Sequence, residues 1–247
     1  MSELAERLLE RLTETDGGQK FPTVRPRDAA TMIIIDRSGA TPKVLLGRRH
    51  HGHKFMPGKF VFPGGRMEPL DRRMGAATPL DPRIEARLMQ HTRRPSADKA
   101  RALALAAIRE TFEETGLLLG APQSQPVASP GGPWDAFAAA QIAPDLGAVH
   151  FVARAVTPPG RTKRFDTRFF AVDAGAIAAR QDGVVGPDTE LTELTWHPIA
   201  EASQLDMPGI TAAVLDELSA RLAAGFSHDL PVPYYRMASR KRMRDLL

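Results

Sequence analysis

The stretch of sequence that decides the fold is R-E-T-F-E-E-T-G-L, residues 109–117. It places Glu110 three residues before Glu113 and four before Glu114, so on an α-helix these carboxylates share one face, with about 5–6 Å between their Cβ atoms. Like charges this close repel each other, and the cluster gains most from a hard divalent cation such as Mg²⁺ or Mn²⁺. Arg109, four residues before Glu113, can hold that carboxylate in place. The alternative interpretation is an acidic helix end that faces solvent.

The residues before this run carry the strongest helical pattern in the chain. Ser96 and Asp98 are suitable N-caps, and Gly116 follows Thr115 as a natural residue just beyond a helix end. The pattern predicts one helix that ends with the acidic cluster.

The rest of the chain alternates between strand and helix patterns, which predicts a single α/β domain over residues 1–247. We expect strands at 31–36, 43–49, 60–62, 149–156, 165–173 and 191–197, and helices at 1–15, 81–90, 134–142, 199–204 and 209–224.

Positive charge is concentrated in two segments. Residues 66–96 are rich in Arg, Pro and Ala without a strong period, and we interpret them as a surface insertion beside the substrate pocket. Residues 235–247 form a basic C-terminal tail, for which we expect a solvated and partly disordered end.

Composition limits the metal ligands, the substrates and the cellular locations that we expect. The 247 residues include no cysteine, so any metal must be held by oxygen or imidazole. The net charge of +4 suits an anionic substrate. The start of the chain lacks the unbroken apolar run of a signal peptide, and no stretch approaches the roughly 18 apolar residues of a membrane span, so we expect a cytoplasmic protein with no membrane partner.

A second motif lies at 62–65, where Phe-Pro-Gly-Gly ends a short strand and lets backbone approach a ligand closely. Together with the run at 109–117 it resembles the Nudix signature, G-x5-E-x7-R-E-U-x-E-E-x-G-U, in which U is aliphatic. The matching residues are Gly65, Arg109, Glu110, Glu113, Glu114, Gly116 and Leu117.

The sequence departs from this signature at two points. Thr111 stands where an aliphatic residue is usual, and Gly65 and Arg109 are 44 positions apart where the pattern gives 14, so an insertion splits the motif. The insertion leaves the first Glu of the pattern unassigned, with Asp71 and Asp98 as candidates.

The split motif resembles the insert-bearing branch of the family that includes peroxisomal-type coenzyme A diphosphatases. A coenzyme A-associated pattern over residues 45–65 is matched at Arg49, at Gly58 and at 62–65, but Gly47, His50 and Lys54 depart from it.

The resemblance implies a Nudix-type α/β/α sandwich with a mixed central sheet and a Mg²⁺ or Mn²⁺ site. Glu113 and Glu114 are the first ligands, together with the carbonyl of Gly65. Glu110 is either a further ligand or the base that takes a proton from water. Family members often draw one more carboxylate from a later loop, for which Glu190 is the candidate.

Other residues are candidates for further roles at the site or in the core. Glu193 is the alternative to Glu190, and Arg48, Arg49 and Lys54 are candidates for binding substrate phosphates. We expect His50, His51 and His53 to contact substrate or solvent rather than zinc, and Trp134 and Trp196 to be packing anchors.

The resemblance predicts a hydrolase of a nucleoside diphosphate conjugate. Coenzyme A or acyl-coenzyme A is the leading substrate, with 3′,5′-ADP and an (acyl-)phosphopantetheine fragment as products. The alternatives are another nucleotide conjugate, such as a dinucleotide, an ADP-sugar or capped RNA, and a Nudix-like sensing or RNA-binding module without turnover. The intact acidic cluster argues against the last. We do not expect a nucleic-acid partner, and a homodimer is an expectation from resemblance alone.

Overall fold

A mixed β-sheet forms the centre of the structure, a computed structural model that describes residues 8, 22, 24–52, 56–239 and 241–247. In spatial order its main strands are β11 (Leu191–Pro198), β2 (Lys43–Arg49), β1 (Arg27–Asp36), β9 (Phe165–Asp173), β8 (His150–Val156), β12 (Pro233–Ala238) and β13 (Lys241–Leu246). The short strands β3 (Phe60–Val61) and β4 (Gly64–Arg66) pair with β2 and β1. Strands β1 and β9 are parallel, as are β8 and β12, whereas the other neighbours are antiparallel.

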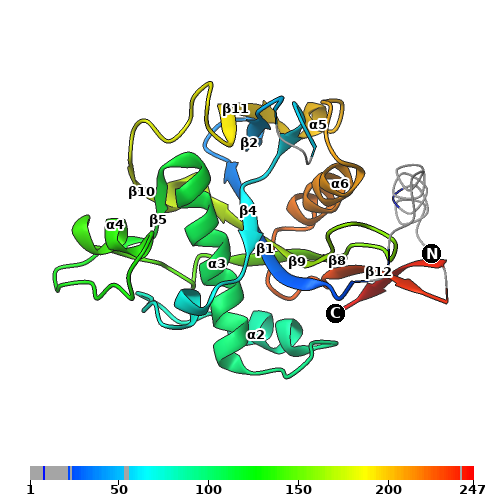
Figure 1. Cartoon of the computed structure of the whole chain (residues 1–247), viewed down its shortest axis with the longest axis horizontal. Coiled ribbons are helices and arrows are strands. Elements are labelled where there is room, and N and C mark those ends of the chain that lie inside the picture. Colours follow the sequence, from blue (N-terminus) through cyan, green and yellow to red (C-terminus); the bar gives the residue numbers. More distant parts are fainter. Residues whose placement is uncertain (1–7, 9–21, 23, 53–55, 240) are drawn as a thin grey trace.

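Helices cover both faces of this sheet (Figure 1). Helices α3 (Ala97–Thr115), α2 (Pro82–Met89) and α4 (Trp134–Ala139) contribute to one core layer, and α5 (Ile199–Ala202) and α6 (Gly209–Ala223) to the other. Strand β1 shows why two layers form: Met32 and Ile34 pack in the α3 layer, whereas Ile33 and Ile35 pack in the α6 layer. Successive strand residues point to opposite faces, so an unbroken apolar run requires cover on both. The predicted α/β/α sandwich is confirmed.

Short elements complete the fold. They are η1 (Pro69–Arg72), β5 (Leu117–Leu119), β6 (Ala121–Pro122), β7 (Ile142–Ala143), η2 (Ala174–Ala176) and β10 (Ile177–Arg180). Strands β5 and β10 pair with each other, as do β6 and β7.

Helix α3 has well-defined ends and one unusual interior residue. The hydroxyl of Ser96 accepts from the Lys99 amide at 3.1 Å, so Ser96 is the N-cap. At the other end Gly116 has a φ of 76°, and a Cβ there would lie 2.1 Å from the Gln181 carbonyl. The buried Thr111 donates its hydroxyl to the Ala107 carbonyl at 2.7 Å, which explains how a threonine is accommodated at an aliphatic position of the signature.

The insertion is not the surface excursion that the sequence suggested. Met74, Leu80, Ile84 and Leu88 are each no more than 5% exposed and belong to the same core as α3. Helix α2 presents Ile84 and Leu88 at a spacing of four residues, which places both on one face. The insertion at 66–96 therefore has a buried apolar side, which its high Arg and Pro content obscured.

The expected disorder of the basic tail at 235–247 is also wrong. Strands β12 and β13 pair along their length and extend the sheet. Arg244 binds Glu217 of α6 with Nε to Oε1 at 2.7 Å, and the Tyr235 hydroxyl donates to the same carboxylate. The charge of the tail is partly neutralised by this buried glutamate and by Asp245, which binds Arg236.

Some expectations fall on residues outside the described part. The N-terminal helix at 1–15 is one, although Leu8 is described as helical and buried. Lys54 and His53 are also outside the described residues. In the described part of the chain, no helix combines the length and apolar character needed to cross a membrane.

Candidate active site

The C-terminal half of α3 presents the three signature glutamates around a buried arginine. Nη1 of Arg109 donates to Oε1 of Glu110 at 2.9 Å and to Oε2 of Glu113 at 3.0 Å. The Arg109 side chain is 2% exposed, whereas that of Glu113 is 34% exposed. Arg109 therefore orients two carboxylates from inside the protein, of which the sequence spacing indicated only Glu113.

Asp71 holds this arginine from the other side. Nε and Nη2 of Arg109 donate to the two Asp71 oxygens at 2.8 and 3.2 Å, and Nη2 also reaches the Arg66 carbonyl at 2.7 Å. Asp71 is fully buried and follows Gly65 by six residues, the position of the first Glu in the signature. Asp98, the other candidate, instead binds Arg72 on the surface.

The two glycines of β4 lie directly against the acidic cluster. A Cβ at Gly65 would lie 2.5 Å from the Glu110 carboxyl group, so a side chain there would displace this carboxyl group. The Gly64 amide donates to Oε2 of Glu114 at 3.3 Å. The split halves of the motif, 44 positions apart in sequence, are therefore in contact.

Burial destabilises the ionised form of the three glutamate carboxylates. Burial, followed by the charges of Glu190 and Glu110, raises the pKa of Glu114 well above its usual value. Burial raises the pKa of Glu110 to about 7, against the opposing effect of Arg109. Burial also raises the pKa of Glu113. The site thus carries more negative charge than Arg109 compensates, which is the condition that a bound cation relieves.

The structure separates the two candidates for the later carboxylate. Glu190 binds Arg49 at 3.0 Å, and its charge acts on Glu114, so it lies beside the acidic cluster. Glu193 binds Arg48 at 3.6 Å, and these two residues face each other across strands β11 and β2, next to the pair of Leu191 and Arg49. Both proposed phosphate-binding arginines are therefore already paired with glutamates.

Three further residues show what the sequence did and did not reveal. Trp134 is fully buried against Phe137, with ring centroids 5.0 Å apart, which confirms it as a packing anchor. Trp196 is 36% exposed, so the same prediction fails there. Glu68 was not anticipated, yet its charge contributes to the raised pKa of Glu113. It precedes the 3-10 helix that carries Asp71, and no period or motif marks it.

The donors at this site suit a hard divalent cation, although they are not yet gathered around one point. As the side chains are placed, no group of three or more His, Cys, Asp or Glu among the described residues could hold a metal ion. Glu110 and Glu113 turn toward Arg109, whereas Glu114 turns toward Gly64. All the donors are oxygens with excess negative charge, as Mg²⁺ and Mn²⁺ prefer.

Comparisons with known proteins agree with the fold and the motif. No family model matches the chain. A Nudix hydrolase from Alicyclobacillus acidocaldarius, of known crystal structure, is 29% identical with a TM-score of 0.62, covering 84% of this chain and 97% of that one. Human acyl-coenzyme A diphosphatase NUDT19 is 28% identical over 212 residues, covering 66% of this chain and 55% of the relative. This chain thus spans about half the length of its curated relative.

The fold and the acidic site match those that the resemblance to Nudix proteins implied. The chain resembles Nudix hydrolases in both sequence and fold. Within that family it is similar to the branch with coenzyme A diphosphatases, as the split signature indicated.

Proposed function

We propose that this protein hydrolyses the diphosphate linkage of a nucleoside diphosphate conjugate, with Mg²⁺ or Mn²⁺ bound by Glu113, Glu114 and the carbonyl of Gly65, and with Glu110 as either a further ligand or the base. The observation that carries the proposal is the contact between the two halves of the split motif, with Gly65 against the Glu110 carboxyl group. Arg109 and Asp71 support this contact from the interior.

A divalent cation at this site would neutralise diphosphate oxygens and lower the pKa of a bound water. Hydrolysis would join a water oxygen to one phosphorus and break the bond from that phosphorus to the bridging oxygen, which would leave with the electron pair on the other phosphate. A carboxylate of this chain would accept the proton that the water loses. Arg109 and Asp71 act through the glutamates that they orient.

Glu110 is our first candidate for the base. It is largely buried beside Gly65, and a pKa near 7 suits proton transfer at neutral pH. Glu190 is the alternative, because it lies beside Glu114 and its side chain is 44% exposed. Glu110→Gln should lower kcat by about 10²–10⁴-fold if Glu110 is the base, whereas a loss below tenfold moves the role to Glu190.

Coenzyme A or acyl-coenzyme A is the substrate we favour, since the curated relative carries the name acyl-coenzyme A diphosphatase. The products would be 3′,5′-ADP and (acyl-)phosphopantetheine. A dinucleotide, an ADP-sugar or capped RNA is the alternative.

Product release from a panel of these diphosphates tests the proposal. The assay contains Mg²⁺ or Mn²⁺, with a chelator as control, and chromatography identifies the fragments. We expect metal-dependent release of 3′,5′-ADP from coenzyme A. Absence of turnover on every diphosphate would overturn the proposed function, and a preference for ADP-ribose would overturn the coenzyme A assignment alone.

A further inference from the structure

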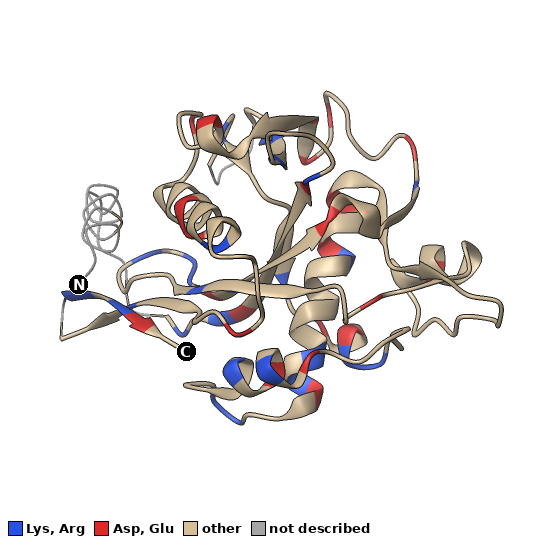
Figure 2. Ribbon diagram, turned by 180° about the vertical axis from the view of Figure 1, so that it is seen from behind, with Lys and Arg blue, Asp and Glu red and all other residues tan. Residues whose placement is uncertain are grey.

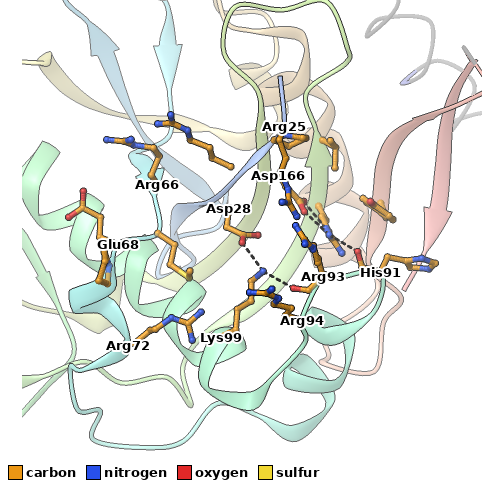
Figure 3. A pocket seen from close by; sticks show the side chains of 17 residues that line it. Arg25, Asp28, Arg66, Glu68, Arg72, His91, Arg93, Arg94, Lys99 and Asp166 are labelled. Carbon is orange, nitrogen blue, oxygen red and sulfur yellow. Dashed lines mark hydrogen bonds and ion pairs between the residues drawn. The ribbon is translucent and has the colours of Figure 1, made fainter. Parts of the chain in front are cut away.

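A basic cavity of about 930 Å³ lies near the N-terminal end of α3 (Figure 3). Arg66 and Glu68 lie on one side of it, and Arg93 and Arg94 lie across from them. A second cavity of about 660 Å³ shares Arg25, Arg27 and Arg66 with the first. We call the space lined by these shared arginines, together with Arg93 and Arg94, the basic cavity.

Most other charges around the basic cavity are already paired. Lys99 binds Asp28 at 2.7 Å, and Arg154 binds Asp166 at 2.7 Å. By contrast, within the described residues no carboxylate lies within ion-pairing distance of Arg25, Arg27, Arg66, Arg93 or Arg94. Five guanidinium groups around one concave space repel each other, and an anionic ligand would relieve that repulsion.

The basic cavity adjoins the candidate active site. Arg66 directly follows Gly65, and its carbonyl accepts from Arg109. Ala30 pairs with Gly65, so Arg27 begins three residues away along β1, about 10 Å at a strand rise of 3.3 Å. A nucleoside that reaches from the cleaved diphosphate across one ribose has the length to meet these arginines.

The lining also offers surfaces for a base. His91 and Tyr234 line the cavity with ring centroids 5.7 Å apart, and Met67 and Val156 add apolar contacts. An aromatic edge beside free arginines suits a phosphorylated nucleoside better than an inorganic anion. Arg48 and Arg49, in contrast, are paired with Glu193 and Glu190.

We propose that the basic cavity binds the nucleoside end of the substrate through a phosphomonoester separate from the diphosphate that is cleaved. Arg27 and Arg66 make the principal contacts with that phosphate. The inference rests on the proposed function for its substrate class, and it adds the site that recognises the second phosphate.

Binding without turnover tests the cavity independently. Calorimetry in a chelator compares adenosine 3′,5′-bisphosphate with 5′-AMP on the wild type, on the double variant Arg27→Ala/Arg66→Ala and on Arg73→Ala. Arg73 is the matched control, an exposed arginine of the same insertion that does not line the cavity. Because charge-assisted contacts are lost, the double variant should bind the bisphosphate about tenfold or more weakly than the wild type does. Its affinity for 5′-AMP, and the affinity of Arg73→Ala for both ligands, should stay within about twofold of wild type.

Several results would overturn the cavity assignment. They are no binding of the bisphosphate by the wild type, equal binding of both ligands by the wild type, an unchanged affinity in the folded double variant, or an equal loss for both ligands. Far-ultraviolet circular dichroism and the melting temperature verify that the variant is folded.

Kinetics separates this inference from the proposed function. The wild type should prefer coenzyme A to dephospho-coenzyme A in kcat/KM, and the double variant should lose most of that preference. An unchanged preference would overturn the cavity assignment while leaving the hydrolase standing. If neither substrate is cleaved, the proposed function fails, and the calorimetric result alone decides whether the cavity binds the second phosphate.

Discussion

The C-terminal half of α3 is acidic, whereas its start carries charges of both signs and lies beside the basic cavity (Figure 2). Its C-terminal half carries Glu110, Glu113 and Glu114, while Lys99 near its start lies beside the basic cavity. Lys99 and Glu113 are 14 residues apart, about 21 Å along the helix axis at 1.5 Å per residue. One helix thus links a region that attracts cations to a region that attracts anions.

These regions also differ in how their charges are held. At the acidic end, the buried pair of Arg109 and Asp71 fixes the carboxylates from within. In the basic cavity, Arg27 and Arg66 lack such partners among the described residues. We conclude that the carboxylates of the acidic end are oriented by partners inside the protein, whereas the cavity would gain its charge balance from a ligand.

The largest effect should come from removing one charge at the acidic end. Glu113→Gln and Glu114→Gln should each lower kcat by more than the roughly 10–100-fold that loss of an outer-shell metal partner costs. Stability without metal should not fall for Glu114→Gln, since burial disfavours the ionised form of that carboxylate. Steady-state kinetics at saturating Mg²⁺ and thermal melts measure both. A wild-type rate in either variant would show that this helix face is not the metal site, and Glu193→Gln is the matched control.

A smaller loss of rate should follow from Asp71→Asn. The change leaves Arg109 buried with a weaker partner, so the carboxylates that it orients should lose position, and kcat should fall about 10–100-fold. Removing one member of a buried pair should also destabilise the protein by about 3–5 kcal/mol. Asp98→Asn is the control, since that exposed pair with Arg72 should contribute less than about 1 kcal/mol. Equal melting temperatures for the two variants would contradict the role of Asp71.

Truncating a buried side chain on the apolar side of the insertion should lower stability without changing catalysis. Leu88→Ala should lower the free energy of unfolding by about 2–5 kcal/mol, because Leu88 is 1% exposed within the α3 core. Chemical denaturation measures the loss, and kcat of the folded fraction should stay near wild type. A cost below about 0.5 kcal/mol would restore the surface interpretation of residues 66–96.

The smallest effect is the change in metal-free stability with pH. The folded protein raises the pKa of Glu110 from 4.5 to about 7, so it holds this proton more tightly than the unfolded chain does. Metal-free stability should therefore fall as pH rises from 4.5 to about 7, by about 2 kcal/mol, or about 4–8 °C in melting temperature.

Mg²⁺ requires the ionised carboxylate, so its stabilising effect should grow across that same window. Glu110→Gln should make the metal-free profile less steep in this window, and the part that remains belongs to Glu113 and Glu114. If Mg²⁺ raised the melting temperature equally at pH 5 and pH 7.5, Glu110 would not be coupled to the metal.

Local signals explain which parts of this molecule the sequence could predict. The run at 109–117 contains its own helix end at Gly116, and the spacing of its glutamates follows from helical geometry. Likewise, the β-branched run at 31–36 predicted a strand, and its burial on both faces follows from its unbroken apolar character.

The failures depend on contacts between distant segments. The tail at 235–247 looks like a solvated basic end until Arg244 meets Glu217, 27 residues earlier. The apolar side of α2 has only two buried residues, Ile84 and Leu88, too few to stand out among the arginines around them. Arg27 and Arg66 come together only because β1 and β4 pair, which neither segment reveals alone.

The most direct test of the account is metal binding at the acidic end, measured by titrating Mn²⁺ into the protein and following free Mn²⁺ by electron paramagnetic resonance. The wild type should bind Mn²⁺ at this site, and Mg²⁺ should displace it. The double variant Glu113→Gln/Glu114→Gln should lose that binding while Glu193→Gln keeps it. Equal Mn²⁺ affinity in wild type and double variant would contradict the central claim that this face of α3 holds the catalytic metal.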